Sequence, residues 1–307
     1  MRVFVAGGTG AIGRHAVRAL VGEGHAVTAV ARTQEKAQAL TELGAHALSV
    51  SIFDRSALAS AFEGHDAVVN LTSAIPPMTQ FMARKAWAEN DRVRTEGSAA
   101  IVDAAISAGV ERVVQESVSM LYPDRGAEWI DEDVPPDVFP MARPNLAAEA
   151  NANRFSERGR TGIVLRFGWF YGPGARHSEQ FLALARRHIC VVMGPSDSYV
   201  SSIYMTDAGA AVAAALHAPA GTYNIVDDEP LKKRDYANAL AAAAGKNAWL
   251  RVPGQAALLF GERSTSLTRS LRVRNTRFRS VTGWVPRYAS AGEGWSAMAK
   301  LLYPDRR

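Results

Sequence analysis

The chain has 307 residues, of which 48% are hydrophobic and 21% are charged, with a formal net charge of +5. This apolar content is enough to bury a large core, so the composition excludes a disordered chain and fits one globular domain or slightly more. Seven arginines and no acidic residue fall between Arg263 and Arg287. We expect a solvated arginine-rich surface there. The alternative is nucleic-acid binding, but the aromatic interleaving and the helix-turn-helix pattern that support such binding are missing.

The cysteine content and the apolar runs exclude further classes. Cys190 is the single cysteine, so no internal disulfide can form; the sequence has no zinc-ligand spacing, and we predict no metal. No apolar run approaches the roughly 20 residues of a membrane helix, so no membrane partner is expected. The sequence passes from Met1 and Arg2 directly into a predicted strand, which leaves no room for a signal peptide. A cytoplasmic location fits these observations.

Strands and helices alternate through the first half of the chain. Continuous Val, Ala and Leu runs predict strands that are buried on both faces, at 3–6, 26–31, 46–50, 67–71 and 112–114. Helical spacing separates these runs. It predicts helices at 11–21, 56–62 and 81–108, and a further helix after the second strand that ends at residue 43. Repeated strand–helix units predict an α/β fold with a doubly wound parallel sheet of the Rossmann type.

This alternation breaks after about residue 120. The stretch 122–144 is rich in proline and acid and predicts a loop, and a helix at 146–156 and a strand at 161–167 then resume the pattern. Shorter elements separated by glycine and proline follow. We therefore predict a dinucleotide-binding domain over 1–167 and a smaller substrate lobe over 168–307, with segments near 207–226 returning to the first domain.

A glycine-rich turn follows the first strand and opens the first helix. Such glycines let the backbone turn tightly and approach a pyrophosphate, while the helix N-terminus offers unpaired N–H groups and partial positive charge. The alternative is a tight turn that binds nothing. The residues predicted to cradle the cofactor are Gly7, Gly8, Thr9, Gly10, Ala11, Ile12 and Gly13.

The residue that follows the second strand distinguishes the two nicotinamide cofactors. An acidic side chain there would bind the 2′-hydroxyl of NAD, but Arg32 follows Ala31 and no acid occurs before Glu35. A guanidinium suits the 2′-phosphate of NADP, by charge and by bidentate hydrogen bonding. The sequence therefore favours NADP(H) over NAD(H); the alternative is a surface arginine.

Six segments in family order resemble the extended short-chain dehydrogenase/reductase family, the NAD(P)-dependent epimerase/dehydratase group. The resemblance covers nearly the whole chain. It includes the turn at 7–13 and the segments 66–72, 109–114, 165–174, 221–230 and 282–287. It implies a Rossmann fold, a nicotinamide cofactor and a Ser/Thr, Tyr and Lys triad that moves protons at a substrate oxygen.

This chain departs from the triad that the resemblance implies. In the family's register, Met141 stands at the tyrosine position and Asn145 at the lysine position. Counting back from Tyr122, which resembles the tyrosine of the family's Val-Tyr-Gly motif, the Ser/Thr position falls on Val118. Neither Met141 nor Asn145 can do the acid–base work, so we predict a protein without the usual triad.

Other positions that the resemblance places near the cofactor also differ. Ser51 stands where the third strand usually ends in an acid near the adenine; Asp54 follows shortly and is the residue predicted to bind the cofactor there. Arg94 replaces an asparagine three residues before Gly97, with Asn90 one helical turn earlier. At the carboxyl ends of the strands, where such sheets bind ligands, three more residues are predicted to contact the cofactor: Leu71, Thr72 and Ser73.

Several side chains remain as candidates for chemistry. Tyr122 is a possible substitute proton donor, and Ser117 and Ser119 possible carbonyl ligands; the alternatives are a packed tyrosine and strand-end hydroxyls that satisfy the backbone. His177 is a possible acid–base group, or simply an exposed histidine. The candidates for an apolar, aromatic substrate pocket are Met78, Met141, Trp129, Trp169 and Tyr171. Arg269 and Arg272 are candidates for binding an anionic group of the substrate. The alternative is that both belong to the solvated arginine-rich surface.

These features leave two hypotheses. The first is an atypical oxidoreductase, isomerase or dehydratase that uses NADP(H) on a small organic substrate. The second is a non-catalytic NADP(H)-binding sensor. The missing triad favours the sensor, and the aromatic small lobe favours the enzyme. Helices at 81–108 and 146–156 resemble the family's dimer bundle, so a homodimer is expected unless those apolar faces are buried within one chain.

Overall fold

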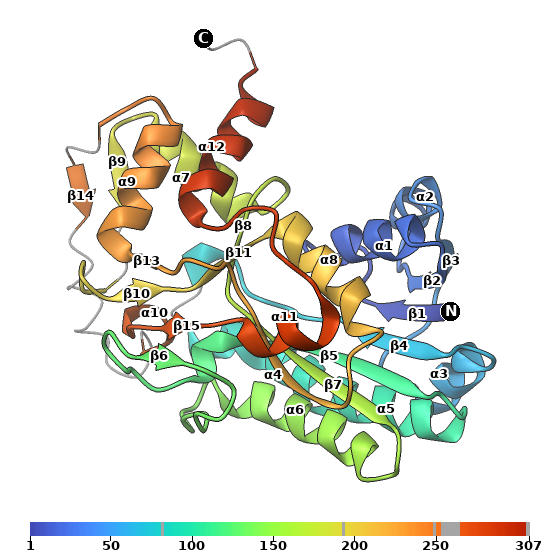
Figure 1. Ribbon diagram of the computed structural model, residues 1–307. Coiled ribbons are helices and arrows are strands. Elements are labelled where there is room, and N and C mark those ends of the chain that lie inside the picture. Colours follow the sequence, from blue (N-terminus) through green and yellow to red (C-terminus); the bar gives the residue numbers. More distant parts are fainter. Residues whose placement is uncertain (81–82, 192–193, 248–249, 253–264, 305–307) are drawn as a thin grey trace.

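The computed structural model describes residues 1–80, 83–191, 194–247, 250–252 and 265–304. Its central sheet has seven parallel strands in the order β12-β7-β5-β4-β1-β2-β3, which confirms the predicted Rossmann-type α/β fold (Figure 1). The strands in chain order are β1 (Arg2–Ala6), β2 (Ala26–Val30), β3 (His46–Leu48), β4 (Ala67–Asn70), β5 (Arg112–Val118), β7 (Thr161–Phe167) and β12 (Gly221–Ile225).

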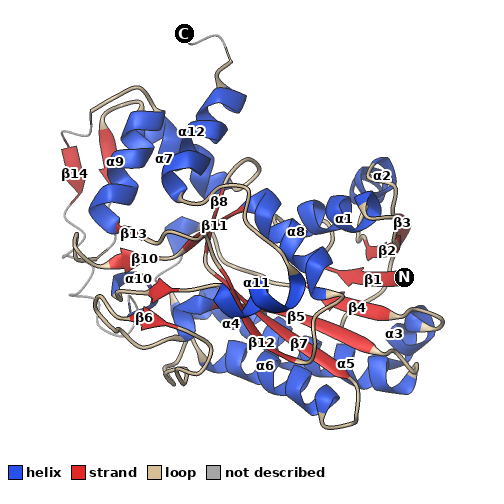
Figure 2. Ribbon diagram, in the orientation of Figure 1, coloured by secondary structure: helices blue, strands red, loops and turns tan. Residues whose placement is uncertain are grey.

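Helices cover both faces of this sheet (Figure 2). One apolar core lies between the sheet and the helices α1 (Gly13–Gly22), α2 (Gln34–Glu42) and α8 (Met205–Ala215). The core on the other face involves α3 (Arg55–Phe62), α5 (Ser98–Ser107) and α6 (Arg143–Ser156). Covering both faces explains why the strands are continuous apolar runs: Val3, Phe4, Val5 and Ala6 are all fully buried.

The structure extends or divides two of the predicted elements. Strand β5 continues to Val118, because Gln115, Glu116 and Ser117 stay in the ladder with β7 although they are polar. The long helix expected over 81–108 begins as α4 (Ala88–Arg92) and continues into α5 through a π-helical stretch, Val93–Gly97. Such local widening of a helix is frequent at functional sites.

The second half of the chain builds a smaller lobe beside the carboxyl edge of the sheet. Helices α7 (Arg176–Ala185), α9 (Lys233–Ala243) and α12 (Ala291–Leu302) share an apolar cluster with Tyr171 and Trp295. The returning segment predicted near 207–226 forms α8, which packs on α1, and β12, which pairs with β7. In the described residues, no helix combines the length and the apolar character that crossing a membrane requires.

Short strand pairs surround the region where the lobe meets the sheet. They are β8 (Trp169–Tyr171) with β11 (Ser202–Tyr204), β10 (Tyr199–Val200) with β13 (Leu231–Lys232), β9 (Ile189–Val191) with β14 (Leu250–Val252), and β6 (Trp129–Ile130) with β15 (Arg272–Val273). The last pair ties the stretch predicted as a loop at 122–144 to the end of the chain. Cys190 lies in β9 and is buried.

Candidate functional site

The glycine-rich turn joins β1 to α1 in a conformation that needs its glycines. Gly7 has φ +85°, and a Cβ there would lie 2.6 Å from the carbonyl carbon and oxygen of Leu71. A Cβ on Gly13 would lie 2.0 Å from the carbonyl oxygen of Gly7, and the Gly10 amide donates to the same oxygen at 2.9 Å. Ile12, at the N-cap of α1, supplies no side-chain cap, so that side chain does not compete with an anion for the helix's first amides.

The segment after β4 lies directly beside this turn. The Leu71 amide donates to Ala6 at 2.9 Å, which continues the pairing of β4 with β1. The Thr72 hydroxyl and amide both donate to Asn70 Oδ1, at 2.6 and 3.1 Å, and Asn70 in turn donates to Gln115 at 2.9 Å. These bonds fix Thr72 next to the turn, while Ser73 is exposed. The glycine-rich turn and the residues Leu71 and Thr72 therefore lie side by side.

The two positions assigned to the adenosine half lie at the start of helices. Arg32 is exposed and follows β2, one residue before Thr33, which caps α2 by accepting from the Lys36 amide at 3.3 Å. Asp54 caps α3, accepting from the Ala57 amide at 3.0 Å and the Ser56 hydroxyl at 2.9 Å. These hydrogen bonds lower the pKa of the Asp54 carboxyl. Its predicted role near the adenine remains a prediction.

A cavity of about 720 Å³ extends from the glycine-rich turn, along the carboxyl edge of the sheet, to the small lobe. Its volume matches the size of small-molecule and cofactor sites. The turn contributes Ala11 and Arg14, the segment after β4 contributes Ile75, and the lobe contributes Trp169 and His177. Most lining side chains are apolar, among them Val118, Met120, Leu121, Phe139, Met141, Phe170 and Met205.

The three positions that the family register assigns to the triad all line this cavity. Val118 ends β5, and Met141 and Asn145 lie at the start of α6. The Asn145 amide donates to the Met141 carbonyl at 3.3 Å. The register read from the sequence therefore brings three separate residues to one site, and none of their side chains ionises near neutral pH.

Two of the residues predicted as substitutes, Ser117 and Tyr122, lie in a buried network with side chains of α6, β7 and β12. Ser117 donates to Glu149 at 2.6 Å, and Arg166 holds both oxygens of Glu149, at 2.9 and 2.7 Å. Arg166 also donates to the Tyr122 hydroxyl at 2.9 Å, and Tyr122 donates to Asn224 at 2.8 Å. Burial raises the pKa of Tyr122, with Arg166 opposing. Tyr122 and Ser117 are fully buried.

Neither Tyr122 nor Ser117 is among the cavity-lining residues in the described part of the chain, and the same holds for Ser119. Ser119 is buried at the start of a single 3₁₀ turn, where its carbonyl accepts from the Tyr122 amide at 3.2 Å. The catalytic roles predicted for these three residues remain predictions. The hydroxyl groups of Ser117 and Tyr122 are bonded within a structural network.

A buried ion pair that the sequence did not single out stands in the cavity wall. Arg94, in the π-helical stretch, donates to Glu116 Oε1 and to the Glu116 carbonyl, each at 2.8 Å, and both side chains are 3% exposed. Burial raises the pKa of Glu116, and Arg94 opposes that shift. The signal for this pair was a lone acid within an apolar strand and an arginine in place of an asparagine.

His177 is the histidine of the cavity wall. Its Nε2 lies 2.7 Å from the Phe170 carbonyl oxygen, which can only accept, so Nε2 carries the proton and Nδ1 is left as the basic nitrogen. The ring packs edge-on against Trp169, with centroids 5.6 Å apart. Burial lowers the pKa of the imidazole, so the ring is mostly neutral at pH 7.

The predicted substrate residues divide between the cavity and the core. Trp169 and Met141 line the cavity. Tyr171 is fully buried against Trp295 and donates to the Ser290 carbonyl at 3.3 Å. The side chain of Met78 lies outside the described residues.

The arginine-rich stretch makes its contacts within the chain. Arg272 lies over the Trp129 and Tyr199 rings, at 4.1 and 4.9 Å, away from the cavity wall. Arg269 donates to the Tyr122 carbonyl and pairs with an aspartate. Arg277 and Arg279 likewise pair with nearby aspartates, at 2.7 and 2.9 Å. These contacts resemble a surface held by ion pairs and ring stacking.

Fold and site together define a dinucleotide-binding protein with an attached ligand cavity. Residues 7–182 match the family model described as NAD(P)H-binding. A 3-diazoavenalumate denitrifying reductase from Streptomyces sp is 33% identical over 313 residues, covering 96% of this chain and 99% of that protein. A 4-hydroxy-2-methyl-3-oxo-4-farnesyl-3,4-dihydroquinoline-1-oxide ketoreductase from Stigmatella aurantiaca is 28% identical, covering 88% and 82% of the two chains.

Solved structures show the same fold over the full length. Human epimerase family protein SDR39U1 with NADPH superposes with a TM-score of 0.83 at 23% identity, covering 98% of this chain and 99% of that one. Thermus thermophilus UDP-glucose 4-epimerase with NAD gives a TM-score of 0.78 at 23% identity, covering both chains fully. The chain belongs to the extended short-chain dehydrogenase/reductase family of NAD(P)H-binding proteins, as the sequence motifs predicted.

Proposed function

We propose that this protein is an NADP(H)-dependent reductase of a small, planar organic substrate, and that it works without the family's Ser-Tyr-Lys triad. The observation that carries the proposal is one continuous cavity. It joins Ala11 and Arg14 of the dinucleotide turn to Trp169 and His177 of the small lobe. A bound dinucleotide and a substrate would share this cavity.

The lining favours a flat, apolar substrate over a sugar nucleotide. Val118 and Met141, at two of the triad positions, replace polar groups with apolar surface, and Trp169 and Phe170 add aromatic rings. The names of the two relatives support reductase chemistry, and one of them acts on a molecule named as a dihydroquinoline oxide. The preference for NADP(H) rests on Arg32, whose exposed guanidinium follows β2 where a 2′-phosphate would lie.

The cofactor, when bound, supplies hydride; the chain must position the substrate and manage the proton. Among the described residues, the titratable side chains that line the cavity are Arg14, Arg94, Glu116, Arg176 and His177. Arginine does not release its proton in proteins. Glu116 forms a buried ion pair with Arg94, and the Oε2 atom of Glu116 is buried away from solvent. His177 is therefore the group in this wall that can exchange a proton near neutral pH.

Reduction of a carbonyl group adds one hydride at carbon and one proton at oxygen. In the imidazolium form, the Nε2–H group of His177 stays hydrogen-bonded to the Phe170 carbonyl. The Nδ1–H group donates its proton to the substrate oxygen. Because burial lowers the pKa of His177, the donor is acidic and is populated as the pH falls. Arg94 and Glu116 hold the cavity wall and contribute no proton.

A screen of NADPH oxidation against planar aromatic ketones, quinones and N-oxides tests this proposal, with NADPH binding followed in parallel by fluorescence. We expect saturable binding and turnover with at least one of these compounds. Binding without consumption across the whole panel would instead support the sensor, which the apolar residues at the triad positions favour. No binding of NADPH would overturn both.

A further inference from the structure

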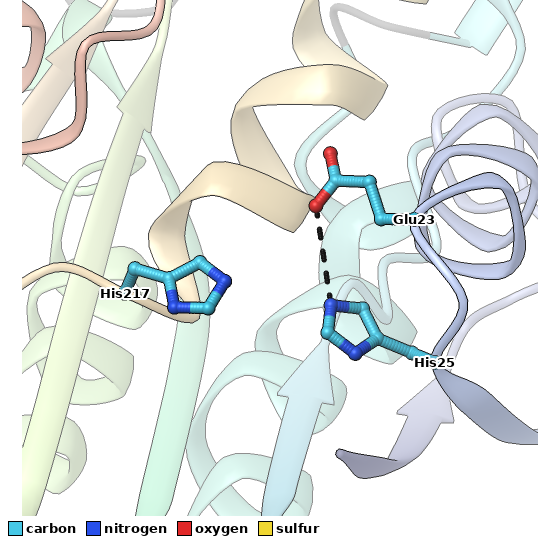
Figure 3. Close-up of side chains that lie close together, drawn as sticks. All are labelled: Glu23, His25 and His217. Carbon is cyan, nitrogen blue, oxygen red and sulfur yellow. Dashed lines mark ion pairs between the residues drawn. The ribbon is translucent and has the colours of Figure 1, made fainter.

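Three metal-ligating side chains converge at the edge of the sheet opposite the cavity (Figure 3). Glu23 follows α1, His25 precedes β2, and His217 lies between α8 and β12. The ends of these elements place the cluster at the amino edge of the parallel sheet, whereas the glycine-rich turn lies at the carboxyl edge. One ligand atom from each residue lies within 4.8 Å of the other two.

His25 is the fixed member of this cluster. Its side chain is 9% exposed, and its Nε2 is buried without a hydrogen-bond partner in the described residues. The nearest carboxylate oxygen, Glu23 Oε2, lies 3.9 Å from that nitrogen, which is too far for a hydrogen bond. A buried polar atom without a partner is costly and calls for a ligand. The other ring nitrogen, Nδ1, lies 3.2 Å from the amino nitrogen of Met1.

We propose that Glu23, His25 and His217 bind a divalent transition metal ion, with zinc as the best match. Two imidazoles and one carboxylate form a common zinc ligand set, in which water occupies the fourth position. For Nε2 to bind the ion, the ring proton must lie on Nδ1 and be donated to the neutral form of the Met1 amino group, 3.2 Å away, so ion binding releases a proton from this pair.

The three ligand atoms must move closer together to bind a zinc ion. Zinc bonds of roughly 2.0–2.2 Å in a tetrahedron place ligand atoms about 3.4 Å apart. The 3.9 Å pair must therefore shorten slightly and the widest pair, up to 4.8 Å, by more. Glu23 and His217 are exposed and can rotate towards the fixed nitrogen of His25. Figure 3 shows the Glu23 carboxylate above that nitrogen and the His217 ring to its left.

Such a site would tie together two turns that are far apart in the sequence. Helices α1 and α8 pack along each other, and the cluster lies where both end. An ion that binds the native chain and not the unfolded one stabilises the fold by mass action. Because the site is at the other edge of the sheet, we expect it to leave NADPH binding unchanged. Sequence motifs do not indicate this site, since the spacing of Glu23 and His25 alone matches no known set of metal ligands.

Titration of the tag-free, chelator-treated chain with Zn²⁺ alone tests the proposal by calorimetry, and Co²⁺ absorption reports the coordination geometry. We expect one equivalent to bind, and His217→Ala and Glu23→Gln each to weaken binding by about tenfold or more. Both residues are exposed, so both variants should fold. His46→Ala, which removes an exposed histidine outside the cluster, should bind as the wild type does.

Two results would overturn the assignment. One is the absence of saturable, one-to-one Zn²⁺ binding to the wild-type chain. The other is binding that His217→Ala leaves unchanged, or that His46→Ala weakens equally. A rise in Tm with added Zn²⁺, absent in His217→Ala, would support the site independently. None of these readouts involves NADPH or turnover, so the reductase proposal stands or falls separately.

Discussion

The two faces of β5 use polar side chains in opposite ways. On one face, Glu116 and Val118 line the cavity, and Val118 stands at the position that the sequence resemblance assigns to a hydroxyl. On the other face, Ser117 points into the network of Glu149, Arg166 and Tyr122. Residue types that suggest chemistry are thus locked in the core, and the cavity wall is largely apolar. Composition near a strand end does not show which face does the chemistry.

The greatest loss of stability should come from the buried network in which Arg166 holds Glu149 and Tyr122. Arg166→Met leaves the Glu149 carboxylate buried without its cation, which should reduce the free energy of unfolding by about 3–5 kcal/mol. Urea denaturation followed by circular dichroism would measure this change. A matched change at an exposed pair, Arg92→Met, should cost under about 1 kcal/mol. Equal losses in the two variants would show that the network is not a stabilising core.

The next effect concerns the dinucleotide turn. Gly13→Ala places a methyl group where the Gly7 carbonyl lies 2.0 Å away, so the turn must open and NADPH affinity should fall by about 100-fold or more. Gly22→Ala is the control in the same helix, because a Cβ there meets nothing within 4 Å. That control should bind normally and gain about 0.5–1 kcal/mol of stability. Calorimetric titration with NADPH distinguishes the two variants.

A smaller effect separates structure from catalysis at Tyr122. Tyr122→Phe removes the hydroxyl that accepts from Arg166 and donates to Asn224, so we expect a loss of about 1–3 kcal/mol in the free energy of unfolding. The turnover number of the folded variant should be unchanged. A large drop in turnover with unchanged stability would reverse the assignment and restore Tyr122 as the proton donor.

The smallest effect concerns cofactor choice. Arg32→Ala should weaken NADPH binding by about tenfold, the equivalent of one charge-assisted contact, and leave NADH binding nearly unchanged. Competitive titration of both coenzymes against the wild type and the variant would measure the ratio. An equal loss for the two coenzymes would mean that Arg32 does not contact the 2′-phosphate.

Much of the fold could be predicted because burial on both faces makes the strands continuous apolar runs. The run at 3–6 became β1 and the run at 161–167 became β7. Strand β5 was predicted too short, because the partners of Gln115 and Glu116 come from Asn70 and Arg94, far away in the chain. Periodicity shows which residues face a core, but not which polar residues have a partner there.

The candidate site was predictable where local spacing determines it. The glycine-rich turn and the register of Met141 and Asn145 follow from short motifs, and the structure brings these residues to one cavity. The location of Tyr171 in the core could not be predicted, since an aromatic residue at a strand end fits either a cavity or a core. The pairing of His25 with His217 likewise depends on the tertiary fold alone.

The pH dependence of NADPH turnover in His177→Gln measures whether His177 donates the proton. Since the pKa of His177 is lowered, kcat/KM for carbonyl reduction by the wild type should rise as the pH falls through a value below about 6.5. In His177→Gln it should be about 100-fold lower and insensitive to pH in that range, with NADPH affinity retained. A variant that keeps both the rate and the pH profile of the wild type would contradict the account.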